Sequence, residues 1–136
     1  MELDLSKPRP RPTPTSQPFW AALRAERVDI QRCDECGHWV HYPRSRCPHC
    51  LSDRLAWHTV SGAGVVYSFS VARQATAPPF EDEVPQIITV VELAEGVRLS
   101  TTLAEVDPAD VRIGMAVEPV FDHRPDGITL LRYRPS

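Results

Sequence analysis

The residues with the clearest chemistry are the four cysteines, which form two C-x-x-C hooks. Cys33 and Cys36 make the first hook, Cys47 and Cys50 make the second, and ten residues separate the two. A C-x-x-C hook turns the backbone so that two thiolates converge, and two facing hooks offer four sulfurs in a tetrahedron. We therefore predict that all four cysteines bind one structural Zn²⁺. Gly37 follows the first hook and can adopt the positive φ of a tight turn.

Two other arrangements would use the same thiols. A pair of disulfides needs an oxidising compartment, and no secretory signal is visible at the start of the sequence. An iron centre of the rubredoxin sort also takes four thiolates, so iron stays open as the bound metal. The colour of the purified protein would distinguish the two, because an iron centre is coloured and zinc is not. His38, His41 and His49 lie close to the hooks. Four thiolates already complete the ligand set, so we expect these histidines to be structural or solvent-facing.

The segments around the hooks read as the short strands of a zinc ribbon over residues 28–57. Residues 28–32 alternate apolar and polar side chains before the first hook, and residues 38–42 leave it, so the sequence predicts a hairpin with half of the metal site in its turn. Trp39, Tyr42 and Trp57 are expected to cover the metal and to supply the small core of this module.

Two different segments precede the ribbon. Prolines alternate with other residues from Pro8 to Pro14, which predicts an extended, disordered tail over residues 1–15. Residues 16–27 read as a helix with Ser16 as its cap and a proline in its first turn. Phe19 and Trp20 at the start of this helix need covering. They either close one end of the ribbon or dock on another subunit, and the sequence leaves both interpretations open.

Residues 58–136 read as a barrel. The sequence predicts strands over residues 60–71, 86–93, 97–103, 116–122 and 128–133, with a short helical turn over residues 107–111. Gly62 and Gly64 interrupt the first strand and indicate a bulge or a sharp bend. Five strands with a bent first strand and a helical turn before the fourth are typical of an OB-fold. The fold class is therefore mainly β, with an N-terminal helix, a zinc ribbon and a five-stranded OB-fold barrel.

Charge and hydropathy exclude several partners. Residues 1–57 carry nine Lys and Arg against seven Asp and Glu, whereas residues 58–136 carry six Arg against eleven acidic residues. An acidic barrel is a poor partner for phosphate backbones, and its Tyr67, Phe69 and Phe121 lie in apolar runs where core packing is expected, so we do not expect nucleic-acid binding. No apolar run approaches the roughly 20 residues of a membrane span. We expect a cytoplasmic protein without a membrane partner.

The sequence offers no obvious catalytic set. It contains no G-x-S-x-G elbow, no Gly-rich phosphate loop and no H-E-x-x-H helix. A zinc ion bound by four thiolates has no open position for water or substrate. We therefore predict a binding or assembly protein without activity of its own.

These residues also carry a resemblance to a known family. The chain resembles the acyl-CoA-associated OB-fold proteins with a rubredoxin-like zinc ribbon, over residues 17–135. The matching motifs are Phe19-Trp20, residues 32–37 and 43–50 around the hooks, residues 61–69, Pro85, residues 91–99, residues 113–117 and residues 132–135.

The resemblance implies a function as a partner subunit. Members of the family are similar in being small subunits or fused domains beside thiolase-superfamily enzymes, including thiolases and steroid side-chain aldolases, or beside hot-dog-fold hydratases. It thus implies a non-catalytic subunit that stabilises a thiolase-like enzyme, in a heterotetramer, with the hydratase partner as the alternative. If the chain also assists CoA-thioester binding, Arg44 and Arg46 beside the second hook are the candidates, because guanidinium groups bind phosphates.

Overall fold

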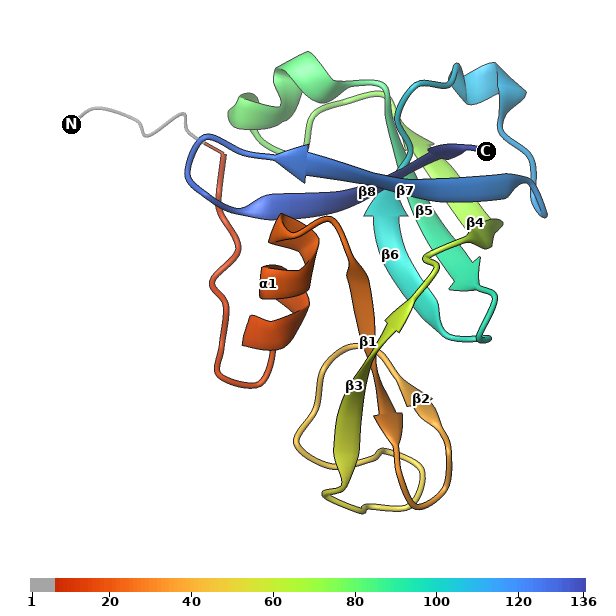
Figure 1. Ribbon diagram of the computed structural model, residues 1–136. Helices are drawn as coiled ribbons and strands as arrows, with labels where there is room; N and C mark the ends of the chain where they lie inside the picture. Colours follow the sequence, from red (N-terminus) through yellow and green to blue (C-terminus); the bar gives the residue numbers. More distant parts are fainter. Residues whose placement is uncertain (1–6) are drawn as a thin grey trace.

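The chain folds into a small ribbon sheet and a larger barrel, with one helix packed between them. The structure is a computed structural model and describes residues 7–136. Figure 1 shows the ribbon sheet below the barrel and helix α1 (Gln17–Arg24) beside both. Within the described residues, no helix is both long and apolar enough to cross a membrane. The fold is mainly β, as predicted.

Helix α1 is shorter than the sequence indicated. Its predicted proline lies in the first turn, and Ala22 and Leu23 form its fully buried face. The helix ends at Arg24, before Glu26 adopts a φ of 60°. Ser16 precedes the helix but its hydroxyl makes no capping hydrogen bond; it accepts instead from the N–H of Thr13 at 2.9 Å. Ser16 therefore occupies the predicted N-cap position, but its side chain does not cap the helix.

The ribbon is a three-stranded antiparallel sheet. Its strands are β1 (Val28–Cys33), β2 (Trp39–Val40) and β3 (Leu55–Val60), in the order β2-β1-β3. Arg32 pairs with Trp39 across the predicted hairpin, and Cys33 pairs with Leu55 on the other side. Each hook thus lies at a strand end, which brings the two hooks to the same end of the sheet. Strand β3 spans the boundary that we placed between residues 57 and 58.

The barrel contains five strands, two hairpins and two short 3₁₀ helices. The strands are β4 (Gly64–Ala72), β5 (Gln86–Leu93), β6 (Arg98–Thr102), β7 (Ala116–His123) and β8 (Thr129–Pro135). The sheet order is β6-β5-β4-β7-β8. The Leu103–Tyr133 bridge and the Thr101 hydroxyl, which donates to the Leu131 carbonyl at 2.8 Å, join β6 to β8. The 3₁₀ helices η1 (Pro78–Glu83) and η2 (Pro108–Asp110) lie in loops, η2 at the predicted helical turn.

The two glycines of the predicted long strand make the junction between ribbon and barrel. Gly62 has a φ of +77°, and an added Cβ would lie 2.7 Å from Pro119. Gly64 passes so close to β5 that a Cβ would lie 2.6 Å from the Glu92 carbonyl oxygen. Only glycine fits both positions. The run therefore divides into β3, which belongs to the ribbon, and β4, which opens the barrel.

The core of the barrel extends into the ribbon. Val28 and Ile30 of β1 belong to the same buried cluster as Val66, Val91 and Tyr133 of the barrel. Phe19 of α1 packs against this cluster and lies 5.2 Å from the ring of His41, measured between centroids. Of the two interpretations of Phe19, this contact supports a covering role within the chain.

Candidate metal centre

The two hooks have the same backbone hydrogen bonds. In each, the N–H of the first cysteine donates to the carbonyl five residues on, and its own carbonyl accepts from the N–H four residues on. The four bonds are Cys33 N to His38 O (2.9 Å), Cys47 N to Ser52 O (2.8 Å), Gly37 N to Cys33 O (2.9 Å) and Leu51 N to Cys47 O (2.8 Å). This repeated turn holds both side chains of each hook on one side of the backbone.

The residue after each hook adopts the left-handed conformation. Gly37 has a φ of 76° and Leu51 has a φ of 66°. The positive φ predicted at Gly37 is thus confirmed, and the second hook achieves the same turn with leucine, at the cost of strain between its Cβ and the backbone. No glycine marks that position, so no local pattern indicated a positive φ there.

The four sulfurs lie together and fit a metal ion. All four Sγ atoms are within 4.8 Å of one another. Cys33 and Cys50 are 3.5 Å apart and Cys36 and Cys47 are 3.6 Å apart, measured between sulfurs. A tetrahedral ion with Zn–S bonds of about 2.3 Å has sulfur–sulfur edges of about 3.8 Å. The cluster matches a tetrathiolate zinc site, and these four side chains are the ones that would hold the ion.

Backbone amides lie against the sulfurs of the two buried cysteines. The N–H of Cys36 donates to the sulfur of Cys33 at 3.5 Å and lowers the pKa of Cys33 to about 7. The N–H of His49 lies 3.4 Å from the sulfur of Cys47. Cys33 and Cys47 are buried, whereas Cys36 and Cys50 are exposed. Each hook therefore contributes one buried and one exposed sulfur ligand, and the exposed pair faces solvent.

The histidines near the hooks lie outside this cluster, as expected. His38 and His49 stack with ring centroids 5.3 Å apart, one from each hook. His41 packs between Phe19 and Tyr42, and burial lowers its pKa to about 4. His41 is thus a structural packing group, whereas His38 and His49 are exposed to solvent.

The expected aromatic cover of the metal is only partly present. Arg32 lies over the ring of Trp39 at 5.0 Å, so Trp39 is enclosed within the ribbon. Tyr42 is 53% exposed, and its hydroxyl accepts from the N–H of Ser100 in β6 at 3.1 Å. The prediction that Tyr42 forms part of the ribbon core is therefore wrong. Its role is to connect the ribbon to the barrel edge, a long-range pairing that no local pattern indicates.

Arg44 and Arg46 lie on the loop between β2 and the second hook, both exposed. The buried Gln31 holds this loop: its amide donates to the Arg44 carbonyl at 3.0 Å, and its carbonyl oxygen accepts from the Arg44 N–H at 2.8 Å. Arg46 donates to the Leu51 carbonyl at 3.2 Å. Arg44 thus has a fixed backbone and an exposed guanidinium, whereas Arg46 stabilises its own hook. Sequence reasoning missed Gln31, because one polar residue in a strand gives no signal of burial.

One predicted core aromatic faces solvent. Tyr67 is 47% exposed, because a register shift between Val66 and Ser68 turns it outward from β4. The guanidinium of Arg98 lies 3.7 Å from its ring centroid, and the same arginine pairs with Glu92 at 3.0 Å. The core assignment of Tyr67 is wrong, whereas Phe69 and Phe121 pack against the core as predicted.

Comparison with protein families gives two matches that together cover residues 20–122. Residues 20–56 match the rubredoxin-like zinc ribbon domain of ChsH2, and residues 57–122 match the C-terminal OB-fold domain of ChsH2. Both assignments agree with the geometry above. The matched ribbon, together with the clustered cysteines, identifies the cofactor as structural zinc.

Individual relatives give the context of these domains. The chain is 39% identical over 132 residues to a probable enoyl-CoA hydratase alpha subunit from Thermomonospora curvata, covering 96% of the chain but only 40% of that protein. It is 37% identical over 109 residues to a DUF35 domain-containing scaffold protein from Methanocaldococcus jannaschii, covering 76% of each. A solved structure named Ltp2-ChsH2(DUF35) aldolase contains a chain that is 35% identical, with a TM-score of 0.83 and coverage of 93% and 98%.

Proposed function

The chain belongs to the DUF35 family of ChsH2-type proteins, which join a rubredoxin-like zinc ribbon to an OB-fold domain, and from this premise we propose that it is a scaffold subunit of an acyl-CoA enzyme. In this role it binds and stabilises a thiolase-superfamily enzyme of the thiolase or steroid side-chain aldolase type. The partner supplies the catalytic residues, and the two proteins form a heterotetramer. This chain contributes a rigid docking body.

One observation carries the proposal. The structural match to a chain of the Ltp2-ChsH2(DUF35) aldolase extends over the ribbon, the helix and the barrel at 35% identity. Similarity over the whole length favours a shared use of the surface more strongly than a shared barrel alone would. The scaffold name of the archaeal relative, matched over 76% of each chain, supports the same role.

The metal centre supports a scaffold rather than a catalyst. Four thiolates complete the tetrahedron, so a bound zinc ion would have no free position at which to polarise a thioester or activate water. The ion's contribution would be to hold the two hooks together. Metal binding supplies the folding free energy that a module of this size lacks.

Assistance with CoA binding rests on Arg44 and Arg46. Both side chains are exposed, and the double hydrogen bond from Gln31 fixes the Arg44 backbone. A fixed arginine can bind a CoA phosphate bidentately with little loss of conformational freedom. Arg44 is the stronger candidate, because Arg46 already donates to the Leu51 carbonyl.

A hot-dog-fold hydratase is the second candidate partner. The observation that favours it is the 39% identity to a probable hydratase alpha subunit, although the chain spans 40% of that protein. Nucleic acid is a weaker alternative. The exposed Tyr67 could stack on a base, but its neighbouring Arg98 is paired with Glu92, and the barrel half is net acidic.

Co-purification tests the proposal. The tagged chain is isolated from its native host, and the proteins that accompany it are identified by mass spectrometry and weighed as an intact complex. A thiolase-fold subunit in a two-to-two complex supports the proposal, and a hot-dog-fold subunit supports the alternative. Salt-sensitive recovery of nucleic acid, or a stable lone monomer, would overturn both.

The CoA assignment is tested in the recovered complex. Arg44→Ala is expected to weaken CoA-thioester affinity about tenfold, corresponding to roughly 1.4 kcal/mol for one charge-assisted contact. Arg54→Ala is the matched control, because Arg54 is an exposed ribbon arginine that pairs with Glu35 at 3.4 Å. Equal affinities for the wild type and both variants would remove Arg44 from the CoA site.

A further inference from the structure

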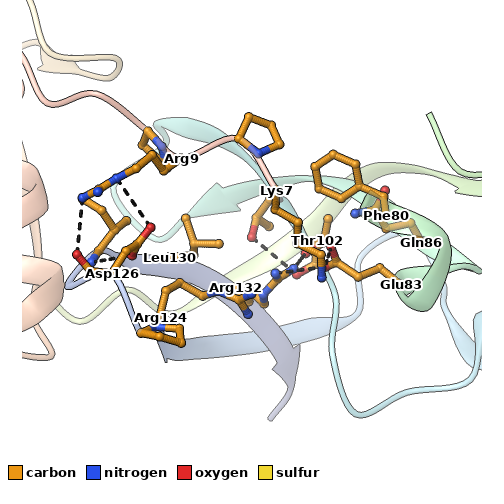
Figure 2. A pocket seen from close by; sticks show the side chains of 15 residues that line it. Lys7, Arg9, Phe80, Glu83, Gln86, Thr102, Arg124, Asp126, Leu130 and Arg132 are labelled. Carbon is orange, nitrogen blue, oxygen red and sulfur yellow. Dashed lines mark hydrogen bonds and ion pairs between the residues drawn. The ribbon is translucent and has the colours of Figure 1, made fainter. Parts of the chain in front are cut away.

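A cleft on the barrel lies where OB-folds bind their ligands. It has a volume of about 520 Å³ and is bounded by residues 7–10, by η1, by the end of β6 and by the β7–β8 turn (Figure 2). Leu130 and Arg132 of β8 form its floor. In five-stranded OB barrels, ligands bind over the second and third strands between the loop after the first strand and the loop before the fifth. Here these elements are β5, β6, the η1 loop and the β7–β8 turn.

The chain's own N-terminal segment crosses this cleft. The Lys7 ammonium lies 3.2 Å from the Asp82 carboxylate and 3.1 Å from that of Glu83, at one end. At the other end, Arg9 lies 3.5 Å from the Asp126 carboxylate and donates to the Asp126 carbonyl at 3.3 Å. Figure 2 shows the Arg9 side chain directed toward Asp126 and the Lys7 side chain directed toward Glu83. Residues 1–6 of the predicted tail lie outside the described residues, and its mobility stays a prediction.

The charges of segment and cleft are complementary. The cleft is lined by Glu83, Asp126, Arg124 and Arg132. Asp82 and Asp122 lie beside it, next to Lys7 and Arg132, and the six groups together carry a formal charge of −2. Lys7 and Arg9 add +2. The Arg132 guanidinium is already hydrogen-bonded within the barrel: it donates to Asp122 at 2.8 Å, to Thr102 at 2.6 Å and to Glu83 at 3.1 Å. Within the described residues, the Asp82 carboxylate pairs only with Lys7, whereas the Asp126 carboxylate also accepts from the N–H of Ile128 at 3.1 Å.

The prolines of the segment lower the conformational entropy that it loses when it becomes ordered on the barrel. Pro8 and Pro10 both line the cleft. Each proline fixes its own φ and restricts the residue before it to extended conformations. Alternation of proline with Lys7 and Arg9 thus keeps the segment extended before it binds. The segment is also tethered to α1, which gives it an effective concentration on the order of millimolar at the cleft.

We propose that this cleft is a binding site for an extended, cationic, proline-flanked peptide, and that residues 7–10 of the same chain are its resident ligand. The segment lies along the position of an OB-fold ligand and pairs with carboxylates at its two ends. The proposal is independent of the partner enzyme, because every group in it belongs to this chain.

The test uses ¹⁵N NMR on the full, zinc-loaded chain. The amide of Arg9 is expected to have a heteronuclear NOE similar to that of the barrel strands. In a Lys7→Ala/Arg9→Ala variant this NOE falls to that of a mobile tail, and the amides of Glu83 and Asp126 shift. Arg11→Ala is the matched control, since Arg11 lies in the same proline-flanked repeat and, within residues 7–136, has no ion pair.

A second measurement tests the ligand class. A peptide with the sequence of residues 7–15 is titrated into the Lys7→Ala/Arg9→Ala variant, and the same cleft amides should shift. Replacing its lysine and first arginine by alanine should weaken binding at least tenfold, and 0.5 M salt should do the same. A mobile Arg9 in the wild type, an unchanged NOE in the double variant, or a peptide that shifts nothing would overturn the proposal. A concentration-dependent NOE would assign the segment to a second copy and overturn binding in cis.

Discussion

Tyr133 should control the stability of the junction between ribbon and barrel. It is fully buried, and its hydroxyl donates to the carbonyl of Gly62 at 2.7 Å. Gly62 is the residue at which the chain turns from β3 into β4. Tyr133→Phe removes one oxygen atom and leaves the ring in place, so it tests this hydrogen bond with almost no change in packing.

The magnitude follows from what the change leaves behind. The Gly62 carbonyl loses its buried donor, and an unsatisfied buried polar group costs about 1–3 kcal/mol. Tyr133 is fully buried, so water does not reach its hydroxyl, and this burial raises the pKa of Tyr133 above its ordinary value. We therefore expect the free energy of unfolding to fall by about 2 kcal/mol. Tyr42→Phe is the control, because the Tyr42 hydroxyl accepts from Ser100 at an exposed site, where a loss of about 0.5–1 kcal/mol is expected.

Chemical denaturation of the zinc-loaded protein, followed by tryptophan fluorescence, measures both variants. Equal slopes with different midpoints would allow the free energies to be compared directly. If Tyr133→Phe unfolds within about 0.3 kcal/mol of the wild type, or is no less stable than Tyr42→Phe, the hydrogen bond to Gly62 does not hold the junction. The reasoning from burial would then be refuted.

Three further predictions concern the ribbon. Elemental analysis should find one equivalent of zinc in a colourless protein. Removal of the zinc by a chelator should unfold the ribbon, which tryptophan fluorescence would report. A ribbon that stays ordered without metal would contradict this prediction. The pKa of His41 is about 4 in the folded state against an ordinary 6.5, so its contribution to stability is complete above pH 6.5 and is lost as pH falls toward 4. The loss is up to about 3 kcal/mol, and His41→Phe should remove that part of the pH profile of unfolding. Gly37→Ala should destabilise the ribbon by about 1–2 kcal/mol, because it places a Cβ at a positive φ. Leu51→Gly should stay within about 1 kcal/mol of the wild type, because Leu51 already bears the strain of a side chain at positive φ. Equal losses of unfolding free energy in the two variants would contradict the hook geometry.

Local patterns predicted the elements of this fold well. The paired hooks, the alternation in β1 and the Pro125-Asp126-Gly127 turn each carry their signal within a few residues, and the structure has a strand or turn at each place. Gly62 and Gly64 also indicated a bend at the right position. These features depend on backbone conformation and short-range chemistry, which the sequence displays directly.

Contacts between distant segments were not predictable in this way. Tyr42 and Ser100 are 58 residues apart, and Tyr133 and Gly62 are 71 residues apart. Nothing near Tyr42 distinguishes a tyrosine that packs in the ribbon from one that reaches the barrel edge. Tyr67 was misplaced for a related reason, since a register shift of one residue reverses which face of a strand a side chain occupies.

These distant contacts explain how two small modules can act as one scaffold. Modules joined by a short connection move relative to each other unless a well-packed interface holds them. Here Ala22 and Leu23 of α1 are fully buried, Val28 and Ile30 of the ribbon enter the barrel core, and two tyrosine hydroxyls bridge ribbon and barrel. The zinc ion fixes the hooks, but it cannot fix the ribbon on the barrel. The proposed scaffold role needs both, so we expect the junction to matter to assembly as much as the metal does.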